Sequence, residues 1–95
     1  MPKYQQYFQE MIEYNKELFN EFKTIHDEYL QNPKEYQEAL NNKGEKVLRI
    51  IRRYENMLCG KSENSGYGKF STGLSDKFWG LIRNYLPRID DIGKK

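Results

Sequence analysis

The stretch "QNPKE", residues 31–35, decides the fold, because it stops one helix and starts another within a single turn of the chain. Asn32 can cap a helix N-terminus, Pro33 fits the first helical position, and Glu35 stands where a capping box is completed. A second helix therefore begins almost where the first one ends. We expect the two helices to form an antiparallel hairpin that turns at Asn32.

The sequence before this turn predicts one long helix over residues 3–31, a range that contains neither glycine nor proline. Its apolar side chains fall in one sector, roughly 160° wide, of a helical projection. The opposite face is polar and rich in glutamate. The apolar sector contains Tyr4, Tyr7, Phe8, Met11, Ile12, Tyr14, Leu18, Phe19, Phe22, Ile25, Tyr29 and Leu30.

The sequence after the turn predicts a second helix over residues 33–59, whose apolar residues keep a single helical phase. These residues are Tyr36, Leu40, Val47, Ile51, Tyr54 and Leu58. Gly44 lies in this stripe without changing its phase, so we expect a continuous helix in which Gly44 permits a close approach of a neighbouring segment. A helix kinked or split at Gly44 is the alternative, since glycine is about 1 kcal/mol less favourable than alanine inside a helix. Gly60 then ends the helix.

Residues 60–72 predict a loop rich in glycine and serine, and residues 73–86 a shorter third helix. Ser75 is a favourable N-cap for this helix and Pro87 stops it. Its apolar side consists of Leu74, Phe78, Leu81, Ile82 and Tyr85. The tail, residues 87–95, contains two isoleucines that are available to pack back onto the helices.

The expected fold is all-α: a long antiparallel helical hairpin with a shorter third helix, in a single domain of 95 residues. At about 1.5 Å per residue the first two helices are each about 40 Å long and the third about 20 Å. The third helix is too short to cover the seam, so part of the apolar stripe should stay exposed. Such a surface predicts a homo-oligomer, most simply a homodimer, or another protein partner. The candidate interface consists of Tyr4, Tyr7, Met11 and Tyr14.

The net charge of +2 conceals an uneven distribution along the chain. Residues 1–42 contain four lysines and eight acidic residues, whereas residues 43–95 contain twelve basic and six acidic residues. A basic half indicates contact with phosphate or with an acidic partner, although a solvated helix face is the simpler interpretation. The candidate basic face of the second helix consists of Lys46, Arg49, Arg52 and Arg53.

The loop adds a second set of basic and aromatic residues, which we take as a candidate binding loop: Lys61, Ser62, Tyr67, Lys69 and Phe70. Basic groups interleaved with aromatic ones suit phosphate contact and base stacking. RNA or DNA binding is therefore the alternative to a self-associating binding module. The sequence shows no helix-turn-helix, zinc-finger, RNA-recognition or KH pattern.

Residues 60–62, Gly-Lys-Ser, match the end of a nucleotide-binding P-loop, but the context of that motif is missing. Glu55 stands where the motif requires a glycine, and a helix precedes the tripeptide where a strand is required. We therefore reject the nucleotide site. A looser phosphate contact through the loop stays open.

The residue types of known catalytic and metal sites do not come together in this sequence. The single histidine, His26, and the single cysteine, Cys59, lie about 30 Å apart along the predicted hairpin, too far for a nucleophile and its base. We expect His26 at the core edge or on the surface. One cysteine and one histidine supply no zinc site, and no Glu-x-x-His pair marks a di-iron bundle. We expect no catalytic residues, no metal and no cofactor, and hence a non-enzymatic protein.

The sequence contains neither a secretory hydrophobic segment nor an apolar run near the ~20 residues of a membrane span. Its single cysteine cannot form an internal disulfide and suits a reducing compartment. We therefore expect a soluble, cytoplasmic protein without membrane contact.

Four segments of the chain resemble a known group of proteins: "YFQEM" (7–11), "LCGKSE" (58–63), "YGKFS" (67–71) and "KFWGLIRNYLPRIDDIG" (77–93). The group comprises short, all-helical proteins of uncultured, ultra-small bacteria of the candidate phyla radiation. The resemblance implies a small intracellular helical protein and carries over no catalytic residues. It directs attention to residues 60–72 and to the start of the third helix.

Overall fold

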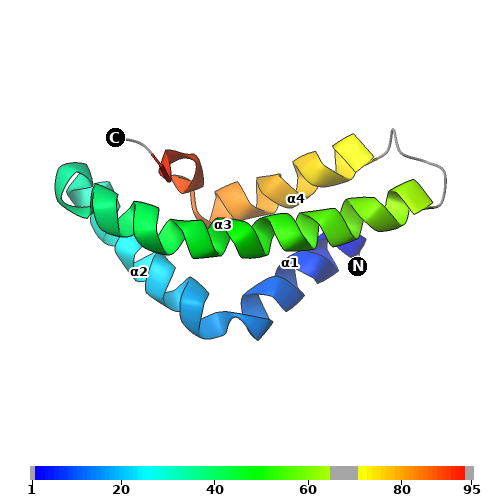
Figure 1. The fold of residues 1–95 in the computed structure, drawn as a ribbon, viewed down its shortest axis with the longest axis horizontal. Coiled ribbons are helices and arrows are strands. Elements are labelled where there is room, and N and C mark those ends of the chain that lie inside the picture. Colours follow the sequence, from blue (N-terminus) through cyan, green and yellow to red (C-terminus); the bar gives the residue numbers. More distant parts are fainter. Residues whose placement is uncertain (1, 65–70, 94–95) are drawn as a thin grey trace.

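The computed structural model describes residues 2–64 and 71–93 and is almost entirely helical (Figure 1). The elements are, in chain order, α1 (Lys3–Tyr14), α2 (Lys16–Gln31), α3 (Pro33–Asn64), α4 (Ser71–Tyr85) and the short 3-10 helix η2 (Ile89–Asp91). The described residues contain no strand. The predicted all-α class is therefore confirmed, with four α-helices in these residues where three were expected.

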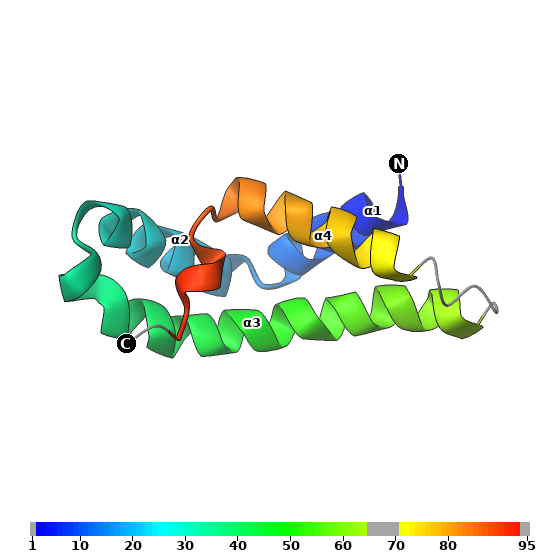
Figure 2. The same ribbon diagram turned by 90° about the horizontal axis from the view of Figure 1, so that it is seen from above.

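Helix α3 runs the length of the molecule. Its 32 residues correspond to about 48 Å at 1.5 Å per residue, and the longest dimension of the fold is 46 Å. In Figure 1, α1 and α2 form a shallow V below α3, while α4 and the C-terminal segment lie above it. Figure 2 shows that these described elements all lie on the same side of α3 and leave its opposite side uncovered.

The predicted single helix over residues 3–31 is wrong at one point, because it is interrupted at Asn15 (φ −122°, ψ 34°). The backbone N–H and the side-chain amide of Asn15 both donate to the carbonyl oxygen of Met11, at 3.2 and 2.9 Å. Asparagine side chains compete in this way with regular helix hydrogen bonding. The interruption divides the predicted helix into α1 and α2 and lets Met11 and Phe19, on either side of it, both be buried.

The continuity of the helix through Gly44 is confirmed, and the alternative of a split helix is wrong. Gly44 is buried, and a β-carbon built on it would lie 2.7 Å from side-chain atoms of Ile92. This distance is far below van der Waals contact. Gly44 therefore permits the close approach of a neighbouring segment that its position in the apolar stripe predicts. The residue that approaches it is Ile92, in the C-terminal segment.

The predicted ends of the second and third helices differ from the observed ones. Helix α3 continues through Gly60 to Asn64, so Gly60 is not the residue that ends it. The penalty for an interior glycine is only about 1 kcal/mol, too small to stop a helix by itself. Helix α4 begins at Ser71, so Ser75 lies inside the helix and is not its N-cap. Of the expected loop, only residues 65–70 fall between the two helices, outside the described part.

The hydrophobic core lies between α3, the V of α1 and α2, and α4. It contains Met11, Phe19, Phe22, Tyr29, Leu40, Val47, Ile51, Leu58, Phe78, Ile82, Leu86 and Ile89, each at most 6% exposed. All of these positions except Leu86 belong to the apolar stripes or to the tail isoleucines identified from the sequence. Helical periodicity therefore locates the core even though it misses the interruption at Asn15.

The C-terminal segment, residues 86–93, packs back onto α2 and α3 as its isoleucines predict, and it is also held by polar contacts. His26 is fully buried instead of lying at the core edge or surface, and its Nε2 accepts a hydrogen bond from the N–H of Arg88 at 3.0 Å. The Tyr29 hydroxyl donates to the buried carboxylate of Asp91 at 3.0 Å. The Gln37 amide donates to the Asp91 carbonyl, also at 3.0 Å.

The large exposed apolar stripe expected along the hairpin is mostly absent. Helix α4 covers the part of the seam formed by α1 and α3, and the C-terminal segment covers the part near the hairpin turn (Figure 1). This cover by residues 86–93 is why less of the stripe is exposed than the lengths of the three predicted helices imply. In the described residues, the large apolar side chains that stay exposed are Tyr14 at 76%, Leu30 at 49% and Met57 at 42%.

Within residues 2–64 and 71–93, none of the helices combines the length and the apolar character that a membrane span requires.

The contact between Gly44 and Ile92 predicts opposite effects for the same substitution at two helical glycines. Gly44→Ala should lower the free energy of unfolding by about 1–3 kcal/mol, because the new methyl group displaces Ile92. Gly80→Ala should raise it by about 0.5–1 kcal/mol, because Gly80 is exposed and has no atom within 4 Å of the added methyl group. Urea unfolding followed by circular dichroism measures both.

A double variant isolates the cause of the Gly44 effect. In the Ile92→Ala background the obstructing atoms are gone, so Gly44→Ala should become stabilising by about 0.5–1 kcal/mol. If Gly44→Ala is stabilising in both backgrounds, Ile92 does not constrain residue 44.

Candidate functional site

The exposed side of α3 carries the candidate basic face, Lys46, Arg49, Arg52 and Arg53. All four side chains are exposed, and together they extend over about 10 Å of the helix. In the described part of the chain, none of them forms an ion pair. These charges therefore take no visible part in holding the fold together.

Two acidic residues of α3 flank this face: Glu45, which is exposed and lies one helical turn from Arg49, and Glu55. Residues 46–54 contain no Asp or Glu, and the next acid along α3, Glu55, is partly buried. Its carboxylate accepts hydrogen bonds from the hydroxyl of Ser75 and, at 2.8 Å, from the indole N–H of Trp79, so it joins α3 to α4. Glu55, which ruled out the P-loop in the sequence, is in the structure a link between two helices.

One acid of α2 does lie close to the start of the basic face. Glu21 pairs with Lys43 at 2.8 Å, and the hydrogen bond and charge of Lys43 lower the pKa of Glu21. The charge of Lys46 contributes to the same shift to a smaller extent.

A groove of about 390 Å³ adjoins the basic face at the interruption between α1 and α2. It is lined by Tyr14, Asn15, Ile50, Arg53, Tyr54 and Met57. Arg53 belongs both to this groove and to the basic face, so the two form one continuous surface. The groove contains Tyr14 and Met57, two of the three exposed large apolar side chains of the described residues.

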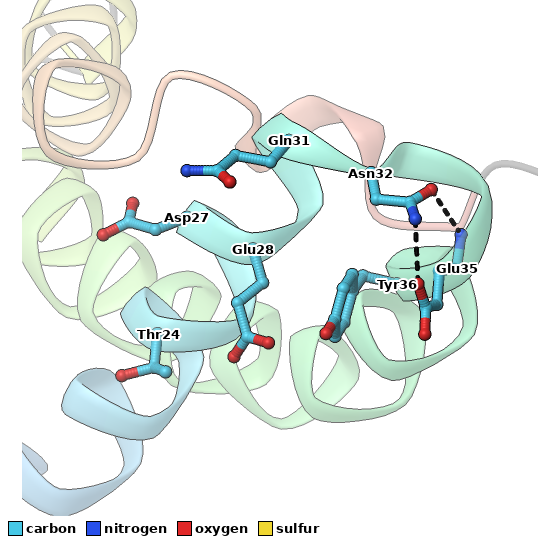
Figure 3. Close-up of a pocket in the computed structure, with 7 residues that line it drawn as sticks. All are labelled: Thr24, Asp27, Glu28, Gln31, Asn32, Glu35 and Tyr36. Atoms are coloured by element: carbon cyan, nitrogen blue, oxygen red, sulfur yellow. Dashed lines mark hydrogen bonds between the residues drawn. The ribbon is translucent and has the colours of Figure 1, made fainter.

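A second hollow, of about 490 Å³, lies at the hairpin turn between the end of α2 and the start of α3 (Figure 3). Here Asn32 caps α3 as predicted, but the Glu35 carboxylate bonds to the side-chain amide of Asn32 and not to its backbone N–H. The side-chain oxygen of Asn32 accepts from the Glu35 N–H at 3.4 Å, and the side-chain amide of Asn32 donates to the Glu35 carboxylate at 2.8 Å. The hollow is lined by Thr24, Asp27, Glu28, Gln31, Asn32, Glu35 and Tyr36.

The carboxylates of this hollow make it negative, and a hydrogen bond and the charge of Glu28 raise the pKa of the Tyr36 hydroxyl. Asp27 is paired with Lys23 at 3.3 Å and contacts His26. In residues 2–64 and 71–93, no group of three or more His, Cys, Asp or Glu side chains is arranged to hold a metal ion. The acidic hollow is thus explained by capping and ion pairing at the turn.

The other residues singled out from the sequence are placed as follows. In the candidate interface, Met11 is fully buried in the chain's own core, and Tyr4 and Tyr7 are partly buried against that core. Tyr14 is the one member of the set that is exposed. Burial within the same chain withdraws Met11 from any contact with a partner.

The candidate binding loop is only partly covered by the structure. Lys61 and Ser62 belong to helix α3 and not to a loop, because that helix runs on to Asn64. Tyr67, Lys69 and Phe70 lie outside the described residues.

The groove was not predicted, because it depends on the interruption of the first helix. Ile50, Tyr54 and Met57 look like ordinary members of the apolar stripe or its edge when α3 is considered alone. The available signal was Asn15, a poor interior helix residue in the middle of a run that otherwise favours helix. A bend predicted at Asn15 would have moved Tyr14 away from α3 and so indicated a groove between them.

Comparison of the chain with family models, with curated proteins and with solved structures finds no match in any of the three.

The contacts of Glu55 predict a structural role that is separable from the basic face. Glu55→Ala should lower the free energy of unfolding by about 1–3 kcal/mol, because Trp79 and Ser75 both lose their acceptor. Glu45→Ala, which removes an exposed acid from the same helix, should change it by less than about 0.5 kcal/mol. Urea unfolding followed by the fluorescence of Trp79, the single tryptophan, measures both variants. Equal effects would mean that Glu55 does not join the helices.

Proposed function

We propose that this chain is a non-enzymatic binding protein that contacts nucleic acid through the basic face of α3. The observation that supports the proposal is the set of four exposed cationic side chains on the uncovered side of that helix, none of them in an ion pair within the described residues. The proposal assigns no catalytic residue, metal or cofactor to the chain.

The physical basis is the release of counterions from a polyanion. Each phosphate that a lysine or arginine neutralises releases condensed cations, so affinity is high at low salt and falls as salt rises. Arginine is the better residue for this contact, because its planar group donates two parallel hydrogen bonds to a phosphate. Three of the four residues of the basic face are arginines. Their exposure leaves these donors accessible to a ligand.

Self-association, the function expected first from the sequence, has weaker support. It relied on a long exposed apolar stripe, and α4 and the C-terminal segment cover most of that stripe. Stable homodimer interfaces are large and apolar. The exposed apolar side chains of the described residues are few, and Leu30 lies at the hairpin turn, apart from Tyr14 and Met57.

Charge removal on the basic face tests the proposal. The double variant Arg49→Gln, Arg52→Gln should bind a labelled oligonucleotide at least about tenfold more weakly at low salt, because two phosphate contacts are lost. The slope of log affinity against log salt should become shallower by about 1.4 for a single strand. Fluorescence anisotropy titrations over a series of salt concentrations measure both quantities.

The matched control removes the same charge elsewhere. Lys34, at the start of α3, and Arg88, in the C-terminal segment, are exposed residues outside the basic face and the groove, so Lys34→Gln, Arg88→Gln should bind nearly as the unmodified protein does. If the unmodified protein does not bind any oligonucleotide at low salt, or if both double variants lose affinity equally, the basic face is not a nucleic-acid site.

A further inference from the structure

The groove beside the basic face contains aromatic surface that folding does not use. Tyr14 is the last residue of α1 and is 76% exposed, although tyrosines elsewhere in α1 are partly buried against the core. It lines the groove together with the partly buried Tyr54 and with Ile50 and Met57. An aromatic ring left in solvent beside an apolar surface is a suitable platform for a flat ligand.

Arg53 gives this groove a positive edge. It lines the groove and lies one helical turn from Arg49, about 6 Å along α3. Lys46 follows about one turn further on. A chain of phosphates along α3 could therefore contact Arg53, Arg49 and Lys46 in succession while a group attached to it enters the groove.

We propose that the groove between Tyr14 and Tyr54 binds an unpaired base of single-stranded nucleic acid, stacked on Tyr14, while the adjacent phosphates contact Arg53 and Arg49. This inference rests on the proposed function and specifies its ligand. The groove volume, about 390 Å³, lies within the roughly 300–1,000 Å³ of typical small-ligand sites. Stacking of a base on an aromatic side chain contributes about 1–3 kcal/mol and tolerates any base.

The same groove distinguishes a single strand from a duplex. Both present phosphates to the arginines, so both bind the basic face through the electrostatic contribution. In a duplex, however, the bases are paired and stacked, and exposing one to the groove costs a few kcal/mol. Only a strand with unpaired bases gains the contact with Tyr14 without this cost.

A second copy of the chain is a poorer occupant of the groove than a polyanion. In a symmetric dimer through this surface the same patch would meet itself, so Arg53 of one copy would approach the basic face of the other. Like charges brought together at an interface oppose association. A nucleic acid strand supplies the complementary charge and the flat apolar group at once.

The test compares Tyr14→Ala, Tyr14→Phe and Leu30→Ala on two ligands: a labelled oligothymidine of about 20 nucleotides and a labelled mixed-sequence duplex of the same length. Tyr14→Ala should weaken single-strand binding about 5- to 100-fold and change duplex binding less than twofold. Tyr14→Phe should retain single-strand binding, since the ring is kept. Leu30→Ala removes an exposed apolar side chain far from the groove and should leave both affinities unchanged.

The outcomes separate this inference from the proposed function. If the unmodified protein binds both ligands and Tyr14→Ala weakens neither, or weakens both equally, the stacking site is wrong while the basic face stands. If the unmodified protein binds neither ligand, both proposals fail. If light scattering shows that Tyr14→Ala converts a dimer into a monomer, a second copy occupies the groove and the inference is overturned. Circular dichroism melting confirms that each variant is folded, which is expected because Tyr14 is exposed.

Discussion

The packing of the Ile92 side chain on the bare backbone of Gly44 is the contact on which the arrangement of the C-terminal segment depends. A larger residue at position 44 would exclude Ile92 and lift the segment from the helices beneath it. Two buried polar residues lie under or within this segment, His26 and Asp91, and each is hydrogen-bonded across the junction. A buried polar group that loses its partner costs about 1–3 kcal/mol. The glycine contact and the polar contacts therefore support each other.

The interruption at Asn15 answers a second geometric requirement, at the other end of the fold. Helix α1 packs on α3 and α4, whereas α2 packs mainly on α3, so the two halves of the long amphipathic run have different neighbours. The apolar sector of one straight helix points in a single direction along its whole length. Such a helix could not face both sets of neighbours. The change of direction at Asn15 lets Met11 and Phe19 both reach the core. It also leaves Tyr14, at the turn itself, outside that core.

The features that could be predicted from the sequence are those set by local periodicity and punctuation. The turn at Asn32 follows from its capping and proline signals. The continuity of α3 and the core positions follow from residues that repeat every three or four places. The end of α3 was misplaced, because one interior glycine is too weak a signal to stop a helix that its neighbours favour. The docking of residues 86–93 and the groove at Asn15 depend on which distant segments meet, and periodicity along one helix carries no such information. The basic face was predictable as a set of residues, but the hydrogen bonds by which Glu55 joins α3 to α4 were not.

The sides of α3 differ in whether their residues stabilise the fold, and this difference locates the candidate functional surface. The sides of α3 that face α1, α2, α4 and the C-terminal segment carry buried apolar groups, a glycine that cannot be enlarged without strain, and a carboxylate that joins two helices. The remaining side carries cations that form no ion pair in the described residues, beside a tyrosine that the core does not cover. Exposed lysine and arginine side chains contribute little to stability, about 0–1 kcal/mol even where they form an ion pair. Because these charges contribute so little to folding, the proposed contact with a polyanion gives their clustering a physical reason.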